Sequence, residues 1–182
     1  MFQNILCGAP IGPVSSRGAP SSVLPRRFGD FPAAPTEQQK KTMKIEIPES
    51  KKLVYEMSIP IRWGDMDAMG HLNNGSYFRY METARIDWMH SIGFEPDPKG
   101  EGMVIVNAFC NFYRQIEYPG NVLLRMYVSD PGRTTFESWA TMARAEAPDV
   151  VCAAGGATTI WVDFPKQKAC ALPDWLRTLV AF

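Results

Sequence analysis

One short stretch of the chain crowds together polar groups that could do chemistry. It runs from Arg62 to Arg85 and reads RWGDMDAMGHLNNGSYFRYMETAR. A carboxylate in such a stretch can deliver or orient a nucleophile, and the unpaired N–H groups at the start of a helix can hold an oxyanion. The stretch therefore contains the types of group that attack on a carbonyl would use, although Asp67 taken alone is more typical of a turn. Its candidate residues are Asp65, Asp67, Gly70, His71, Asn73 and Asn74.

A helix must follow these groups if its N–H donors are to serve the site. Either Asn73 or Asn74 can cap the start of the helix, and Gly93 can end it. We therefore predict a helix from about Gly75 to Ile92. Its apolar stripe recurs at intervals of four, three and four residues and consists of Tyr77, Met81, Ala84 and Trp88.

Strand patterns surround the helix. The segment 52–63 alternates, and Pro60 within it favours a sheet edge. After the helix, turns at 118–120, 130–132 and 147–149 separate four strands, which predicts an antiparallel meander. Gly155–Gly156 predicts a bulge or bend in the last strand, and a short helix is expected to begin near Pro173.

A sheet with a single long helix has only that helix to cover one of its faces. The fold class is therefore α+β. The other face and an edge of the sheet are left available, which favours self-association as a dimer or tetramer.

Composition limits the classes of partner. The chain has 182 residues, 46% of them hydrophobic, and no formal net charge. That charge balance gives no reason to expect nucleic acid or an anionic membrane as a partner. No apolar run reaches the ~18 residues that a membrane span needs. The four cysteines contain no CxxC pair, so we expect reduced thiols and neither disulfides nor a metal site.

The first 45 residues differ from the rest of the chain. They are rich in Pro, Gly, Ser and Ala, and we expect a disordered N-terminal extension. It is either an organelle transit peptide or the result of a misassigned start, with translation beginning at Met43. Residues 46–182 are expected to form the domain. The expected location is cytoplasmic, or an organelle matrix if the extension is a transit peptide.

The stretch GDMDAMGHLNNGSYFRYMETAR resembles the hotdog-fold acyl-CoA thioesterases of the hydroxybenzoyl-CoA thioesterase type. The resemblance covers about Tyr55 to Phe164. It implies a five-stranded antiparallel sheet wrapped around one long helix, an acyl-CoA substrate, and no cofactor beyond the CoA of the substrate. It places the catalytic carboxylate on Asp67 and the amide that polarises the thioester carbonyl near Asn74.

Plant acyl-carrier-protein thioesterases are also similar, through His71, Asn73 and Asn74. They carry a further Asn where this chain has Met69, so their full catalytic set does not transfer. The choice between CoA and acyl-carrier protein stays open, with CoA preferred.

The expected substrate-binding residues form the second half of the site. The segment 70–76 is small and polar, so a ligand oxygen can approach backbone amides closely. Each of these residues also has a structural interpretation, as a cap, a turn or a core side chain. The substrate-binding set is Gly70, His71, Asn73, Asn74 and Tyr77.

Asp67 is expected to act as a nucleophile or to orient water. A carboxylate near a helix N-terminus has its charged form favoured and is a weak base. This suffices because a thiol of pKa about 8.5 leaves readily as thiolate. The structural alternatives are that Asp67 only forms a turn and that Asp65 only holds Asp67 in position. Another hotdog branch uses a helix glutamate, which would be Glu82, but the presence of Asp67 makes that role less favoured.

Two other functions remain as alternatives. One is a non-catalytic acyl-CoA-binding hotdog module, and the other is a hydratase acting on an enoyl thioester. The hydratase lacks support because the spacing from Asp67 to His71 differs from the pattern expected for it. For the CoA phosphates several cations are available without one standing out: Arg125, Arg133, Arg144, Lys166 and Lys168.

Overall fold

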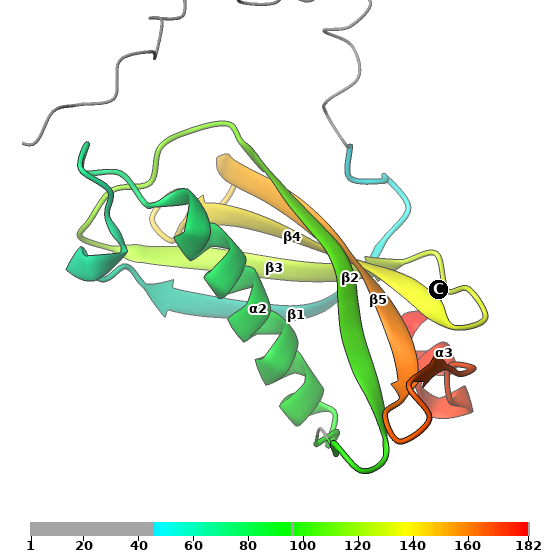
Figure 1. Cartoon of the computed structure of the whole chain (residues 1–182). Coiled ribbons are helices and arrows are strands. Elements are labelled where there is room, and N and C mark those ends of the chain that lie inside the picture. The colour runs from blue at the N-terminus through cyan, green and yellow to red at the C-terminus, as the bar shows by residue number, and fades with distance from the viewer. Residues whose placement is uncertain (1–45, 96, 182) are drawn as a thin grey trace, which may run out of the picture. The chain divides into compact units, whose positions relative to one another are not determined.

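The computed structural model describes residues 46–95 and 97–181, so the predicted N-terminal extension lies outside the described residues. One antiparallel sheet and a long helix make up most of this part of the chain (Figure 1). The elements in chain order are β1 (Lys52–Pro60), η1 (Trp63–Asp65), α2 (Asn74–Ser91), β2 (Glu101–Phe112), β3 (Asn121–Ser129), β4 (Thr135–Arg144), β5 (Val151–Asp163), β6 (Lys168–Ala169) and α3 (Asp174–Val180).

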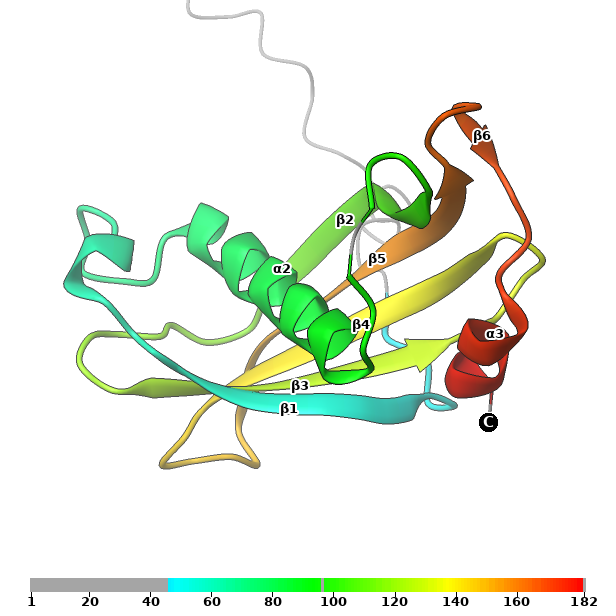
Figure 2. The same cartoon turned by 90° about the horizontal axis from the view of Figure 1, so that it is seen from below.

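The long helix α2 lies across one face of the sheet, as Figures 1 and 2 show. Its predicted stripe is buried, with Ala84 and Trp88 at 0% and 2% exposure. The Trp88 ring meets Phe136 of β4 edge to face, with ring centroids 6.2 Å apart. Packing of this apolar stripe against the sheet supplies most of the stability that a helix lacks on its own.

The predicted start and stop signals lie at the two ends of α2. Asn73 is the N-cap, and its Oδ1 accepts a hydrogen bond from the Gly75 N–H at 2.8 Å. At the other end Gly93 has φ +75°, a left-handed conformation that glycine adopts without strain. Its N–H donates to the His90 carbonyl at 3.0 Å. The observed helix is therefore shifted by one residue from the predicted span.

The strand order is β1-β3-β4-β5-β2, with the two-residue β6 added beside β5. The predicted meander is therefore right for β3, β4 and β5 and wrong for β2. Strand β2 pairs with β5 at one edge of the sheet, and β3 pairs with β1 at the other edge.

The turn predicted at 118–120 belongs to a crossing and does not close a hairpin. The segment 113–120 leads from β2 at one edge to β3 near the opposite edge. It is fixed on the way by the Leu72 N–H, which donates to the Ile116 carbonyl at 2.7 Å, and by burial of the Ile116 side chain.

Gly155 and Gly156 make no bulge, which was one of the two predicted alternatives. Both pair in regular register with β2 and β4. A Cβ built on Gly155 would lie 2.9 Å from the Met81 sulfur and 2.4 Å from the Phe109 carbonyl oxygen. The glycine thus allows α2 to approach the centre of the sheet.

Two further features complete the fold. Helix α3 begins after Pro173, as predicted. No helix within residues 46–95 and 97–181 combines the length and apolarity required to cross a membrane.

Candidate active site

The loop between β1 and α2 is held in place by a buried carboxylate. Asp65 is 6% exposed, and its Oδ2 accepts hydrogen bonds from the Tyr80 hydroxyl at 2.8 Å and the Arg62 N–H at 3.2 Å. Its backbone carbonyl accepts from the Asn73 N–H and the Ser76 hydroxyl. Asp65 therefore ties the loop to the first two turns of α2, and its carboxylate is not available to a substrate.

Asp67, two residues later, is arranged differently. It is exposed, and its Oδ1 accepts hydrogen bonds from the Met69 N–H at 2.8 Å and the His71 N–H at 3.1 Å. No described residue donates to its Oδ2. The same aspartate therefore makes the turn that the structural interpretation predicted and keeps one carboxylate oxygen free.

The electrostatics of Asp67 follow from these contacts. The backbone N–H groups of His71 and then Met69 lower its pKa below the ordinary value, because they stabilise the charged form. A carboxylate of lowered pKa stays ionised at neutral pH and is a weak base. That favours nucleophilic attack or orientation of water over strong proton abstraction.

Asp67 shares one open pocket of about 240 Å³ with the start of α2. Asn74 is the first residue of that helix, and no described residue accepts a hydrogen bond from its N–H. An unpaired N–H at the positive end of a helix is suited to hold a developing oxyanion. The pocket is lined by Asp67, His71, Leu72, Asn74, Tyr77, Phe112, Tyr113, Arg114 and Gln115.

Tyr77 forms the apolar floor of this pocket. It is 3% exposed and meets the Phe112 ring edge to face, with centroids 4.9 Å apart. Burial raises the pKa of its hydroxyl to about 12, so it is neutral at physiological pH. His71 is also in the pocket. Its carbonyl accepts a hydrogen bond from the Asp67 N–H, its own N–H donates to the Asp67 Oδ1, and its Nε2 lies 3.9 Å from a carboxylate oxygen of Glu117.

The remaining two predicted residues lie outside this pocket. Gly70 lines a neighbouring hollow of the same loop, which Asp67 also borders, and its φ of +79° makes the turn that returns the chain to His71. Asn73 uses its side chain to cap α2, and its N–H is bonded to the Asp65 carbonyl. The structure thus brings together Asp67, His71, Asn74 and Tyr77.

The family model of the thioesterase-like superfamily matches residues 61–180. The chain belongs to the thioesterase-like superfamily. This match and the antiparallel sheet around α2 confirm the predicted hotdog fold and the predicted family resemblance.

Solved structures of similar proteins agree with this membership. A protein of Pseudomonas aeruginosa assigned as a thioesterase is 28% identical, with a TM-score of 0.68, covering 71% of this chain and 100% of that chain. A protein of Xanthomonas campestris assigned as an acyl-CoA thioesterase is 27% identical, with a TM-score of 0.58, covering 62% of this chain and 95% of that chain.

A curated relative gives a shorter match. A protein of Aquifex aeolicus assigned as an esterase is 30% identical over 80 residues, which is 42% of this chain. The match spans 62% of that relative, less than two thirds of its length.

Two polar residues of the pocket that holds Asp67 were not predicted from the sequence. Arg114 and Gln115 follow β2 and line the pocket with Asp67. Arg114 is exposed, and its guanidinium has no hydrogen-bond partner among the described residues. The signal was weak: an Arg-Gln pair directly after a long apolar strand, far in sequence from the acidic stretch.

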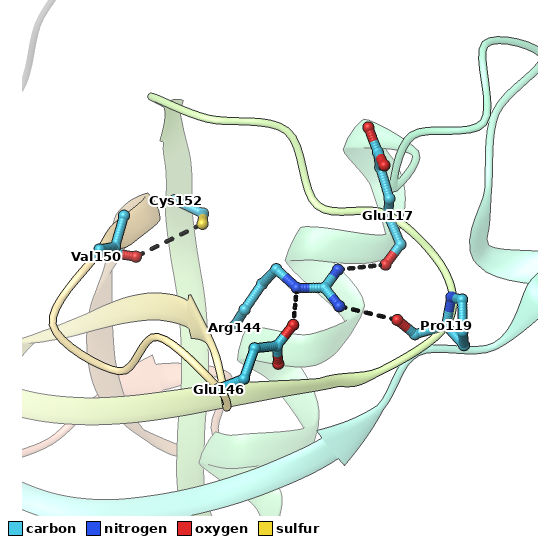
Figure 3. Close-up of polar contacts among 6 residues, drawn as sticks. All are labelled: Glu117, Pro119, Arg144, Glu146, Val150 and Cys152. Carbon is cyan, nitrogen blue, oxygen red and sulfur yellow. Dashed lines mark hydrogen bonds and ion pairs between the residues drawn. The ribbon is translucent and has the colours of Figure 1, made fainter.

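Arg144 braces the loop that carries this pair. Its guanidinium donates to the carbonyls of Glu117 and Pro119 and pairs with Glu146 (Figure 3). It also lines a hollow next to Arg114. Because its donors are already engaged, Arg144 is the less free of the two cations.

The other groups considered from the sequence lie elsewhere. Glu82 borders a separate hollow farther along α2, and His90 is exposed in the last turn of that helix. Within the described residues no cluster of three or more His, Cys, Asp or Glu side chains is arranged to hold a metal ion.

Proposed function

We propose that this chain hydrolyses acyl-CoA thioesters to a free acid and CoA. One observation carries the proposal: Asp67, whose Oδ2 is free, and Asn74, whose N–H is unpaired, line the same pocket. A nucleophile and an oxyanion donor are the two groups that attack on a thioester carbonyl requires. Family membership supports the reaction class.

In the proposed reaction the thioester carbonyl oxygen points at the Asn74 N–H. The Oδ2 of Asp67 attacks the carbonyl carbon, the C–S bond breaks and CoA leaves as thiolate, and water then cleaves the resulting anhydride. In the alternative form of the same reaction, Oδ2 orients a water molecule that attacks directly. Neither form needs a cofactor, because a thiolate leaves without help from a strong acid.

The CoA phosphates need a cation at the mouth of the pocket, and we assign this role to Arg114. It borders both the Asp67 pocket and the adjoining hollow with Arg144, and its guanidinium is free. A planar guanidinium is well matched to phosphate oxygens.

Self-association is part of the proposal. Strand β2 is an edge strand, and its apolar residues Val104, Ile105 and Val106 are 37%, 37% and 56% exposed. A long exposed apolar edge is normally covered by pairing with another strand. We expect a particle of twice the chain mass by light scattering, and Val106→Lys should shift it toward monomer. An unchanged mass for the variant would place the interface elsewhere.

The hydrolytic proposal is tested by following free-thiol release from a panel of acyl-CoAs of varied length and aromaticity. Turnover of at least one member, with release of an equal amount of acid, is expected. Tight acyl-CoA binding with no thiol release would instead support a binding module. Loss of an enoyl double bond by absorbance, with no thiol release, would support a hydratase.

A further inference from the structure

A second hollow lies between the later turns of α2 and the sheet, with a volume of about 290 Å³. We call it the Arg85 pocket. Its walls are mostly apolar and include Met89 of α2, Met103 of β2 and Phe136 of β4. Arg85 is eleven residues beyond Asn74, which at the helical rise is about 16 Å along the axis from the Asp67 pocket.

One polar atom on the sheet side of this pocket has no partner. Thr159 of β5 is 2% exposed, and its hydroxyl oxygen has no hydrogen-bond partner among the described residues. Buried hydroxyls in folded proteins are nearly always paired. A threonine whose hydroxyl is left over at the wall of a cavity therefore points to a group that arrives from outside the chain.

A second polar group borders the same pocket from the helix side. Arg85 is partly buried, and its guanidinium makes no hydrogen bond or ion pair with any described residue. Burial lowers its pKa, although an arginine keeps its charge at any physiological pH. The carboxylate of exposed Glu82, three residues earlier on the helix, acts on Arg85 only through the electrostatic field.

A ligand that satisfies both groups needs an acceptor with negative charge and an apolar body. We propose that the Arg85 pocket binds a small apolar carboxylic acid, with its carboxylate accepting hydrogen bonds from the guanidinium of Arg85 and the hydroxyl of Thr159. Charged hydrogen bonds of this kind are the strong ones in protein sites. The proposal does not depend on hydrolysis at Asp67, because it concerns binding alone.

The test uses calorimetric titration of the full chain with sodium octanoate and, as the uncharged match, octan-1-ol. Wild type is expected to bind octanoate at least about tenfold more tightly than the alcohol. Arg85→Met should raise the Kd for octanoate about tenfold and leave the alcohol unchanged, and Thr159→Val should raise it roughly fivefold. Glu82→Gln removes a negative charge that repels the octanoate carboxylate, so it should lower the Kd for octanoate. Misfolding of the variant would not tighten binding in this way.

Asp67→Asn separates this pocket from the candidate active site. If octanoate binds in the Arg85 pocket, this variant retains the wild-type Kd. The proposal is overturned if octanoate fails to bind, if Arg85→Met and Glu82→Gln both leave its Kd unchanged, or if Asp67→Asn weakens it as much as Arg85→Met does. If the chain does not hydrolyse thioesters, each of these binding measurements can still be interpreted, because none of them depends on turnover.

Discussion

The unpaired N–H of Asn74 can be removed without disturbing the helix that carries it. Asn74 is the first residue of α2, a position where proline is favoured because its missing N–H breaks no helical hydrogen bond. The preceding residue, Asn73, has φ −61° and ψ 139°, an extended conformation that a following proline prefers. Asn74→Pro should therefore fold with an intact α2.

The expected effect is on the rate of the chemical step. Loss of one oxyanion-hole donor typically costs about 3 kcal/mol of transition-state stabilisation, which is on the order of a hundredfold in kcat. The side chain of Asn74 is also lost in the variant, so Asn74→Ala is the matched control. It keeps the backbone N–H and should retain most of the activity, unless the side-chain amide is itself the donor.

The assay is steady-state thiol release with the best acyl-CoA of the panel, and circular dichroism checks that α2 is retained. A lost transition-state donor lowers kcat while KM changes little, whereas a proline ring that merely crowds the pocket raises KM. Equal kcat values for Asn74→Pro and Asn74→Ala would refute the assignment of the oxyanion donor to this N–H.

Four further predictions follow from the same geometry. Asp67→Asn keeps the Oδ1 that accepts two N–H groups, so the fold should be unchanged while kcat falls roughly a hundredfold or more; Asp97→Asn, with the same exposed turn contact to a backbone N–H, should be neutral. Because the folded pKa of Asp67 is lowered, its carboxylate should become protonated, and kcat/KM should fall, only below pH 3.8. A fall in kcat/KM centred near pH 6.5 would instead indicate a histidine base. Tyr80→Phe removes the hydroxyl bonded to buried Asp65 and should lower the free energy of unfolding in urea by about 2 kcal/mol; no loss would mean that the carboxylate finds another donor. Arg114→Ala should raise KM for an acyl-CoA about tenfold but not for the matching acyl-pantetheine, which lacks the phosphates, and an equal rise for both would remove the phosphate role.

The helix of this fold was predictable from the sequence and the strand order was not. The stripe of α2, its asparagine cap and Gly93 are local signals read over one short span, and the structure places the helix within a residue of the prediction. The place of β2 depends on pairing with β5, some fifty residues later, for example Cys110 opposite Gly155. Nothing local distinguishes that pairing from a hairpin with β3, because the turn residues at 118–120 suit either path.

The residues of the site also differ in whether local sequence or long-range topology brings them together. Asp67, His71, Asn74 and Tyr77 belong to one contiguous stretch, so their proximity follows from a loop leading into a helix. Arg114 reaches the pocket only because the crossing after β2 runs past that loop. A residue delivered by a long-range crossing gives only a weak local signal, however important its role.

The contacts that hold this crossing position the reacting groups of the proposed reaction separately from the group that binds CoA. The Leu72 N–H bonds to the Ile116 carbonyl, and His71 forms a β-bridge with Glu117, so backbone geometry fixes the two walls of the pocket relative to each other. The reacting carbonyl would be held by a backbone N–H and a carboxylate whose position is set by backbone bonds. The CoA end would be held by the exposed side chain of Arg114. Substitutions along α2 and β2 could therefore change which acyl group is accepted while leaving the reacting groups in place, and Arg114 could change carrier affinity independently of both.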